Sequence, residues 1–459
     1  MIVWSVSKKH RTVASLLILL LVLTVQLGML SGYKSDKPHE FNSIPLTSKG
    51  GKTPCETGSA SSAPITSNAT SAPYYYHAQS VKDLNPILSH IPARAFPPWP
   101  HADLPCFPPL QQWWEEISYA QSTQTGLLLA KTHKTGSTTA ASIHLRLARN
   151  IALRSSHKNY SICAARFDHL PLPKDAFPHR HRHESFLWTI VREPTQRLIS
   201  AFFFFQVTRN HVPPLDQHFQ EFLQTSSLAE SNYYAQYLSL RLMDSTRRYN
   251  KNNSNPTPEE DTTKNTTLLP DIIESILKDY DFVAVAERMD ESAVVLSMLL
   301  NVSLADVLYL SSKASTAGHF DTFRGICSYI VPSFVSPGMQ TYFASPVHAQ
   351  RTLGDRLVYA AAEASLDRTI DALGRSAFAE RLQTFRHAQQ IVQEQCAPRT
   401  RFPCAADGDG RRRAATHCLW KDAGCGLKCL DQVATELDLW GPSWAPIREH
   451  RRRGAVNKE

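Results

Sequence analysis

The sequence predicts an α/β fold with a mainly parallel, three-layer sheet, because three of its segments share one pattern. Residues 127–130, 186–191 and 282–286 are short apolar runs, and each is followed by an amphipathic helical segment. Strands that alternate with helices favour a parallel sheet, since each helix returns the chain to the same edge. With 459 residues, the chain is long enough for one large domain of this class and additional segments.

The turn after the first strand is rich in groups that bind anions. Its members are Lys131, Lys134, Thr135, Gly136, Ser137, Thr138 and Thr139. A helix is predicted over 138–148, and a helix N-terminus offers unpaired N–H groups and a partial positive charge. The turn therefore predicts a phosphate site. It lacks the ATP-binding pattern G-x-x-x-x-G-K-[ST], because Lys134 precedes Gly136, and this argues against a nucleotide kinase.

The turn after the second strand predicts another anion site. Arg192 stands at the strand end, and Pro194 occupies the first turn of the next helix, a favoured position. Arg197, Ser200 and Phe204 share a face of that helix by their spacing. Arginine offers two parallel donors to a phosphate. Two such sites, roughly sixty residues apart, predict a ligand with two separate phosphate clusters.

Both motifs resemble those of sulfotransferases, which use 3′-phosphoadenosine 5′-phosphosulfate (PAPS). The run K-T-G-S-T at 134–138 is similar to their phosphosulfate loop, and R-E-P-x-x-R-x-x-S at 192–200 to their 3′-phosphate motif. The segments 131–139, 285–300 and 366–374 resemble the galactose-3-O-sulfotransferase family, which includes the galactosylceramide enzymes, over roughly 126–396. The resemblance implies a P-loop-like sulfotransferase fold, PAPS as sulfate donor and no metal. It also implies transfer to the 3-hydroxyl of galactose on a glycolipid or glycoprotein.

The resemblance also implies roles for single residues. Lys134 is expected to neutralise charge on the leaving phosphate and to act in catalysis, helped by the hydroxyls of Ser137 and Thr138. Arg192 and Ser200 are expected to hold the 3′-phosphate. The rest of the donor-binding loop is Lys131, Thr135, Gly136 and Thr139.

The catalytic base is predicted by position and chemistry. The family carries a His pair before an M-R-F-type segment, and here the corresponding run is I-C-A-A-R-F at 162–167. His169 follows this run and is the predicted base, since imidazole titrates near working pH. The alternatives are His133, Asp168 and Glu184. The run H-R-H-R-H at 179–183 is predicted to be a solvated loop, because its arginines would repel a metal ion.

The N-terminus predicts entry into the secretory pathway. Residues 13–30 carry no formal charge and are just long enough to cross a bilayer. Cations at 8, 9 and 11 precede them, so 1–12 should be cytosolic and the rest lumenal, as in a type II membrane protein. A cleaved signal peptide is the alternative. The resemblance implies the Golgi membrane. Five glycosylation sequons agree with a lumenal chain: Asn68, Asn159, Asn252, Asn265 and Asn301.

Nine cysteines also suit an oxidising compartment. Five of them lie within 396–429, and the absence of a C-x-x-C pair favours disulfides over a zinc knuckle. An odd number leaves at least one cysteine outside an intrachain pair.

The predicted organisation continues along the chain. Residues 31–120 form a stem and a proline- and aromatic-rich lead-in that packs on the catalytic domain through residues such as Trp99. The catalytic domain spans 121–395, with a mobile polar insertion at 247–267 and helices over 353–395. A Cys-rich module and a basic tail occupy 396–459.

The net charge of +8 suits an anionic ligand, and no nucleic-acid-binding signature is present. Two rival functions remain open from the sequence. One is a uronyl 2-O-sulfotransferase of glycosaminoglycans, which carries the same two motifs. The other is an inactive lumenal glycan-binding protein of the same fold, favoured by the missing His pair.

Overall fold

The computed structural model describes residues 92–101, 104, 106, 125–154, 163, 165–169, 172–177, 180–240, 258–311, 319–323 and 326–441. The predicted membrane anchor at 13–30, the stem and the basic tail after 441 lie outside these residues. Within them, no helix combines the length and apolar character needed to cross a membrane.

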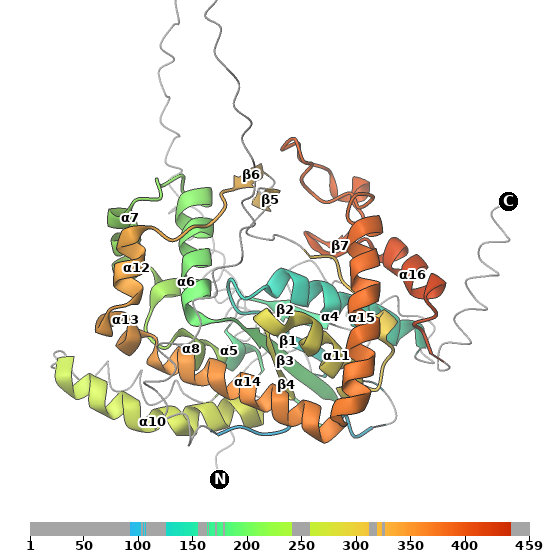
Figure 1. Cartoon of the computed structure of the whole chain (residues 1–459), viewed down its shortest axis with the longest axis horizontal. Coiled ribbons are helices and arrows are strands. Elements are labelled where there is room, and N and C mark those ends of the chain that lie inside the picture. The colour runs from blue at the N-terminus through green and yellow to red at the C-terminus, as the bar shows by residue number, and fades with distance from the viewer. Residues whose placement is uncertain are drawn as a thin grey trace, which may run out of the picture. The chain divides into compact units, whose positions relative to one another are not determined.

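A four-stranded parallel sheet forms the centre of the molecule (Figure 1). Its strands are β1 (Gly126–Ala130), β2 (Ala165–Asp168), β3 (Ser185–Val191) and β4 (Phe282–Val285), in the order β2-β1-β3-β4. All three strand pairs are parallel. Strands β1, β3 and β4 are buried along their whole length, as expected for a parallel sheet covered on both faces. The α/β prediction and the three strands predicted from the sequence are confirmed.

The strand order places the ends of β1 and β3 side by side. From β1 the chain crosses to β2 on one side, and from β3 it crosses to β4 on the other side. Ala130 at the end of β1 pairs with Thr189 of β3. Ligands of open α/β sheets bind at such a switch point, outside the carboxyl ends of the strands. The two anion-binding turns predicted from the sequence both start there.

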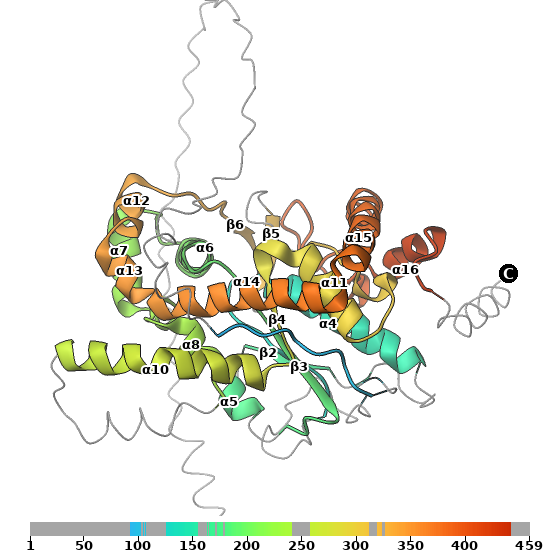
Figure 2. The same ribbon diagram turned by 60° about the horizontal axis from the view of Figure 1, so that its bottom comes forward.

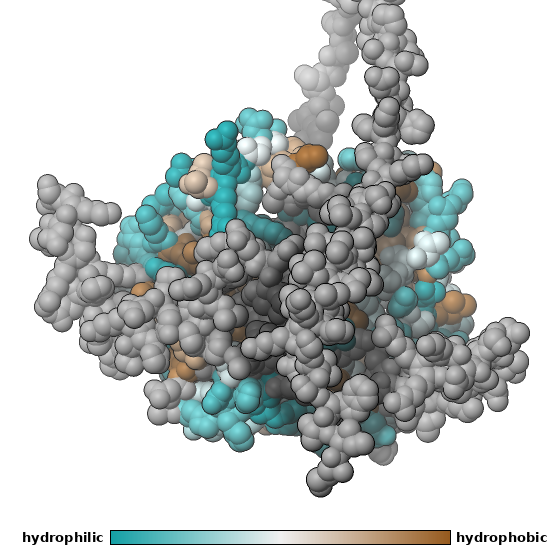
Figure 3. Space-filling model, turned by 180° about the vertical axis from the view of Figure 1, so that it is seen from behind, coloured by the Kyte–Doolittle hydropathy of each residue, from teal (hydrophilic) through white to brown (hydrophobic). Residues whose placement is uncertain are grey.

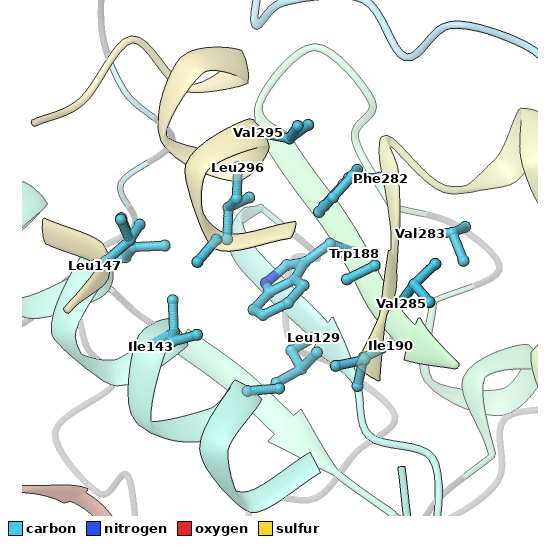
Figure 4. Close-up of a cluster of buried hydrophobic side chains, with 14 of the residues drawn as sticks. Leu129, Ile143, Leu147, Trp188, Ile190, Phe282, Val283, Val285, Val295 and Leu296 are labelled. Atoms are coloured by element: carbon cyan, nitrogen blue, oxygen red, sulfur yellow. The ribbon is translucent and has the colours of Figure 1, made fainter. Parts of the chain in front are cut away.

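Helices cover both faces of the sheet (Figures 1 and 2). One face carries α4 (Ser137–Arg154) and α11 (Met289–Leu299), and the other carries α8 (Tyr233–Leu238), α10 (Pro258–Asp279) and α14 (Leu353–Leu373). Figure 4 shows the core on the first face, where Trp188 of β3 lies among Leu129, Ile143 and Leu296. Figure 3 shows that hydrophilic residues cover most of the described surface on one side of the molecule. The apolar side chains are thus concentrated inside.

The remaining elements are shorter or lie outside the sheet. They are α5 (Pro173–Ala176), α6 (Pro194–Ala201), the π-helix η1 (Phe202–Arg209), α7 (Asp216–Thr225), η2 (Ser227–Ala229), η3 (Ala286–Arg288), η4 (Leu304–Val307), β5 (His319–Phe323), β6 (Ile326–Ile330), α12 (Pro337–Phe343), α13 (Pro346–Arg351), α15 (Arg375–Cys396), η5 (Arg413–Ala415), β7 (Cys418–Trp420), β8 (Ala423–Cys425) and α16 (Leu427–Glu436). Gly374 separates α14 from α15 with a φ of +93°, so the predicted helical region is two helices.

The C-terminal elements pack directly on α4. The backbone N–H of Gly424 in β8 donates to Ser142 Oγ at 3.1 Å. Buried Arg146 of α4 pairs with Asp431 of α16 at 3.1 Å. A buried pair of this kind fixes geometry more than it adds stability. The Cys-rich segment is therefore part of the same packed body as the helix that follows the first anion-binding turn.

Four disulfides join Cys106 to Cys163, Cys327 to Cys404, Cys396 to Cys429 and Cys418 to Cys425. They confirm the disulfide prediction over the zinc knuckle. Across the described residues, no cluster of three or more metal-ligating side chains occurs. The ninth cysteine, Cys55, lies outside those residues.

Three further predictions from the sequence can be compared with the structure. The lead-in prediction is confirmed for Phe96 and Trp99: Phe96 is buried and packs edge-on against Phe282, and Trp99 packs edge-on against Phe186.

The mobile loop predicted at 247–267 is wrong from Pro258 onward, where α10 begins. A proline followed by three acidic residues is a favourable helix start, which explains the difference.

The solvated loop predicted at 179–183 is also wrong in part. Arg180 is buried and donates to Asp281 Oδ2 at 2.9 Å and to the Asp279 carbonyl at 2.7 Å. Arg182 pairs with Asp279 at 2.5 Å. These arginines tie the start of β3 to the end of α10, through partners about a hundred residues away in the sequence.

Candidate functional site

The turn between β1 and α4 is shaped to present its backbone N–H groups. Lys134 and Gly136 have φ angles of +63° and +73°, in the left-handed region. Left-handed and right-handed residues in succession form a concave nest of N–H groups that binds anions. A Cβ atom on Gly136 would lie 3.2 Å from Met289 Cε, the flexible end of that side chain, so it is the backbone angle that favours glycine here. Strain at a non-glycine residue such as Lys134 is typical of functional turns.

The hydroxyl groups of two threonines hold this turn in place through hydrogen bonds to β3 and within the turn. Thr132 Oγ1 donates to the Ile190 carbonyl of β3 at 2.5 Å. Thr135 Oγ1 lies 2.7 Å from Thr132 Oγ1 and donates to the Thr132 carbonyl at 3.2 Å. Both side chains are fully buried. The hydroxyl of Thr135 is therefore engaged inside the turn. Ser137, Thr138 and Thr139 form the first turn of α4.

Cations gather around the turn. Lys134 Nζ lies 3.6 Å from the centroid of the Phe204 ring, and Arg209 Cζ lies 4.2 Å from the same centroid. The pKa of His133 is lowered to about 4, first by burial and then by the charges of Arg197, Lys131, Lys134 and Arg209. A neutral imidazole among four cations marks a strongly positive region. Such a field favours an anionic ligand at this turn.

The turn between β3 and α6 touches the first turn directly. Arg192 Nη1 donates to the Lys134 carbonyl at 3.3 Å, and its Nε lies 3.9 Å from Glu287 Oε1. Glu193 caps α6 by accepting from the N–H groups of Thr195 and Gln196 at 3.0 and 2.7 Å. The Glu193 carboxylate is thus used as a helix cap and leaves Arg192 to other partners. The predicted pair Arg192 and Ser200 belongs to this turn and its helix, and Ser200 is nine-tenths buried.

Arg197 has a packing role. It is 2% exposed, and both of its Nη atoms donate to the Leu228 carbonyl at 3.1 Å. Its guanidinium also lies 3.9 Å from the centroid of the Tyr233 ring. The residue therefore joins α6 to α8 and η2, beneath the surface of the site.

His169, the predicted base, directly follows the end of β2. Its Nδ1 lies 2.6 Å from the Lys131 carbonyl. A carbonyl only accepts, so this contact places the proton on Nδ1, and Nε2 is then the nitrogen that carries the lone pair of the neutral ring. The ring stacks on His133, with centroids 4.0 Å apart and planes 18° from parallel. The predicted base and its main alternative are thus neighbours.

The other two alternatives are placed differently. Asp168 is the last residue of β2 and lies next to His169 in the chain. Glu184 is exposed and precedes β3, where its carbonyl accepts from Gly126 at the start of β1. Glu184 is therefore at the amino edge of the sheet, one strand length away from the turns. A carboxylate there is too distant to act as the base, so this alternative is wrong.

Three tyrosines on α8 hold the site together, and the sequence prediction missed them. Tyr233 Oη lies 2.9 Å from His133 Nδ1. Tyr234 Oη accepts from Arg192 N at 2.9 Å and donates to Arg192 O at 2.6 Å. Tyr237 Oη lies 2.9 Å from the Lys131 carbonyl and 2.6 Å from the His169 carbonyl. One short helix thus contacts the ends of β1, β2 and β3.

The start of α8 is fixed by a buried carboxylate. Asp355 of α14 accepts from Tyr234 N at 2.6 Å, and burial raises its pKa to about 6. A usable signal was present in the sequence: the run Y-Y-A-Q-Y at 233–237 places tyrosines at the i, i+1 and i+4 positions of one helix.

The fold and the turns define an α/β protein with a cationic site at the switch point of its sheet. The galactose-3-O-sulfotransferase family model matches residues 155–402, more than half of the chain, and the chain belongs to this family. The matched range contains His169, Arg192 and Ser200 and begins after the turn at 131–139. Searches of curated proteins and of solved structures found no match. The family resemblance predicted from the sequence is confirmed, and it identifies a sulfotransferase that acts on carbohydrate.

Proposed function

We propose that this sulfotransferase moves the sulfuryl group of PAPS to the 3-hydroxyl of a galactose residue on a glycolipid or glycoprotein. The observation that carries the proposal is the contact between the two anion-binding turns, where Arg192 Nη1 meets the Lys134 carbonyl at 3.3 Å. A donor with phosphates at both its 3′ and 5′ positions needs two such sites at one sheet edge. Family membership supports the sugar acceptor.

The proposed reaction is an in-line transfer. The galactose oxygen forms a bond to sulfur while the bond from sulfur to the 5′-phosphate oxygen breaks, and adenosine 3′,5′-bisphosphate leaves. Lys134 and the N–H groups of the turn stabilise the charge that develops on the leaving phosphate. Nε2 of His169 takes the proton of the acceptor hydroxyl. Because the cations and N–H groups of the chain supply the positive field, the proposal includes no catalytic metal.

The base assignment has a direct test. His169→Ala should lower turnover by about 10²–10⁴-fold, the usual share of general base catalysis. Its affinity for adenosine 3′,5′-bisphosphate should stay close to that of the parent protein, measured by calorimetry. His133→Ala is the matched variant, because His133 stacks on the same ring. Full turnover in the His169 variant together with loss of turnover in the His133 variant would reassign the base.

The acceptor is tested by incubating the lumenal domain with radiolabelled PAPS and a panel of galactosides, galactolipids and glycosaminoglycans. Label on the 3-hydroxyl of galactose is the expected result. Label on uronic acids alone would favour the 2-O enzyme. PAPS binding without transfer to any member of the panel would favour an inactive glycan-binding protein.

We also propose that the chain is a type II glycoprotein of the Golgi membrane, anchored by residues 13–30. The support is the order of cations and apolar residues at the N-terminus and the suitability of Asn301, which is exposed at the end of α11. Glycosidase treatment of the membrane fraction should reveal a glycan on Asn301 that Asn301→Gln removes. Secretion of a chain whose new N-terminus lies near Ser31 would instead identify a cleaved signal peptide.

A further inference from the structure

The order of the strands determines from which side the acceptor reaches the donor. This inference rests on the proposed function, which assigns the donor phosphates and the base to the ends of three strands. The 3′-phosphate turn follows β3, the phosphosulfate turn follows β1, and His169 follows β2. Because these strands are neighbours in the order β2-β1-β3, the three tasks lie in a line along the sheet edge. The acceptor must reach the sulfuryl group from the β2 side. Since β2 is the edge strand, whatever flanks β2 forms the acceptor side.

The hairpin of β7 and β8 flanks β2. Trp420, the last residue of β7, packs on Phe167 of β2 with ring centroids 6.5 Å apart. Lys131 Nζ lies 5.9 Å from the centroid of the same Phe167 ring. The Lys131 carbonyl is also the partner of His169 Nδ1. Trp420 is therefore connected to the predicted base through two contacting residues.

The hairpin also has an electrostatic link to the π-helix η1. Burial lowers the pKa of Arg209, the last residue of η1, while the carboxylates of Asp321 and Asp422 raise it. Asp422 belongs to the two-residue turn between β7 and β8. Arg209 in turn contacts the ring of Phe204, on which Lys134 also packs. The first anion-binding turn is thus contacted by η1 through Phe204, and the hairpin reaches it through Phe167.

The hairpin is held rigidly in this place. The disulfide between Cys418 and Cys425 joins its two strands, and Gly424 donates to Ser142 of α4. Lys421 in the turn has a φ of +39°, in the left-handed region that glycine and asparagine adopt more readily. A positive φ is the ordinary geometry of a two-residue hairpin turn, so the turn that carries Lys421 has a defined shape.

The exposed groups of the hairpin are an aromatic ring and cations. Trp420 is partly exposed, and its ring has Lys421 Nζ at 5.6 Å and Arg413 Cζ at 5.8 Å. Both cationic residues are exposed. An indole face presents a rigid apolar surface suited to a sugar ring, and the cations beside it suit a carboxylate or a sulfate.

We propose that the β7–β8 hairpin is an acceptor subsite for an acidic saccharide. Trp420 binds the sugar next to the reacting galactose, and Arg413 and Lys421 bind the acid group of that sugar. The carboxylate of a uronic or sialic acid and a sulfate already present on the glycan share this chemistry.

The test compares two acceptors that differ only in the acid. One is a galactose–glucose disaccharide, and the other carries glucuronic acid in place of glucose. Sulfate transfer is measured at saturating PAPS. The parent protein should have a lower KM for the acidic disaccharide. The double variant Arg413→Gln, Lys421→Asn should raise that KM about fivefold to tenfold, since exposed ion pairs each contribute a small factor. Its KM for the neutral disaccharide should not change.

Two further variants separate the subsite from a general charge effect. Trp420→Ala should raise the KM of both disaccharides, on the order of tenfold, because it removes the shared stacking surface. Arg412→Gln is the matched control, since Arg412 is an exposed arginine of the same run and has no contact with the Trp420 ring in the described structure. The subsite is overturned if Trp420→Ala leaves both KM values unchanged, or if Arg412→Gln matches the double variant. A 3-O-sulfated glucose in the second position, compared with glucuronic acid, distinguishes sulfate from carboxylate.

A failure of the proposed function gives a different result. In that case the parent protein transfers sulfate to neither disaccharide. Calorimetry then measures the binding of the same two disaccharides and tests the acceptor subsite independently of sulfate transfer. Tighter binding of the acidic disaccharide that depends on Trp420 and Lys421 supports it, and equal binding by parent and variants overturns it.

Discussion

The turn after β1 and the turn after β3 both present cations at one edge of the sheet, but they hold these cations differently. The first turn lies in a region of concentrated positive charge: its own Lys131 and Lys134, with Arg197 of α6 and Arg209 of η1, lower the pKa of His133, after burial. In the second turn Arg192 has a carboxylate, Glu287, at 3.9 Å. Its backbone is bonded at both N and O to Tyr234.

This difference suits the two turns to two roles: stabilising charge that develops during the reaction, and binding a group whose charge is constant. A turn with excess positive charge and a strained backbone is suited to charge that develops during a reaction, since its field is present before the reaction starts. A turn whose arginine is held by a carboxylate and a tyrosine is suited to binding a group that keeps its charge throughout. Interactions that do not strengthen in the transition state lower KM without raising turnover.

Of the predictions that compare the two turns, the one with the largest expected effect concerns Lys134. Lys134→Ala should lower turnover by about 10²–10³-fold at saturating donor, as removal of a donor to a developing anion does. The measurement is initial sulfate transfer at several PAPS concentrations. Lys428→Ala, which changes an exposed lysine of α16, is the control. If the Lys134 variant shows an increased KM with unchanged turnover, the two turns do not differ in kind.

A smaller effect is expected from Arg192→Ala. Loss of the contacts to the 3′-phosphate should lower the affinity for adenosine 3′,5′-bisphosphate by about tenfold to a hundredfold, since hydrogen bonds to charged groups contribute roughly 1.5–3 kcal/mol. Turnover at saturating PAPS should change little. Calorimetry with the bisphosphate and with adenosine 5′-phosphate makes the test specific, because only the first ligand should discriminate between variant and parent. Equal bisphosphate affinity in both proteins would remove Arg192 from the 3′-phosphate site.

The smallest expected effect is a change of pKa. The free protein holds the pKa of His133 at about 4, so this imidazole is neutral at pH 7 and gains its proton only in acid. A bound anion offsets the nearby cations, and the pKa of His133 should therefore rise, by on the order of one unit. NMR titration with and without the bisphosphate measures it. His348, which contacts Thr195 in the second turn, is the comparison and should shift less. A fall in the pKa of His133 on binding would contradict the anion site at the first turn.

The features that could be predicted from the sequence are those determined by residues close together in the chain. Both turns and the helices that follow them were predicted for this reason. The role of Arg197 was not found, since it depends on the Leu228 carbonyl, a partner that only the fold supplies. The tyrosines of α8 were missed for the same reason: their hydroxyls meet main-chain and imidazole groups 42 to 106 residues away. A polar group that will be buried looks the same in the sequence as one that will meet solvent.

The π-helix Phe202–Arg209 gives this chain one place where a residue can be lost at small structural cost. A π-turn holds more residues than an α-turn, so loss of a single residue would let the segment return to ordinary α-helix. The side chains that follow would keep their orientation, because the wider turn already accommodates the extra residue. Phe204 and Arg209, which contact each other from positions five residues apart, would still share a face at a spacing of four. The same deletion within α4 or α14 would rotate every following side chain by about 100° around the axis. Among descendants of this chain, loss of one residue should therefore be accepted more readily in this segment than in those helices.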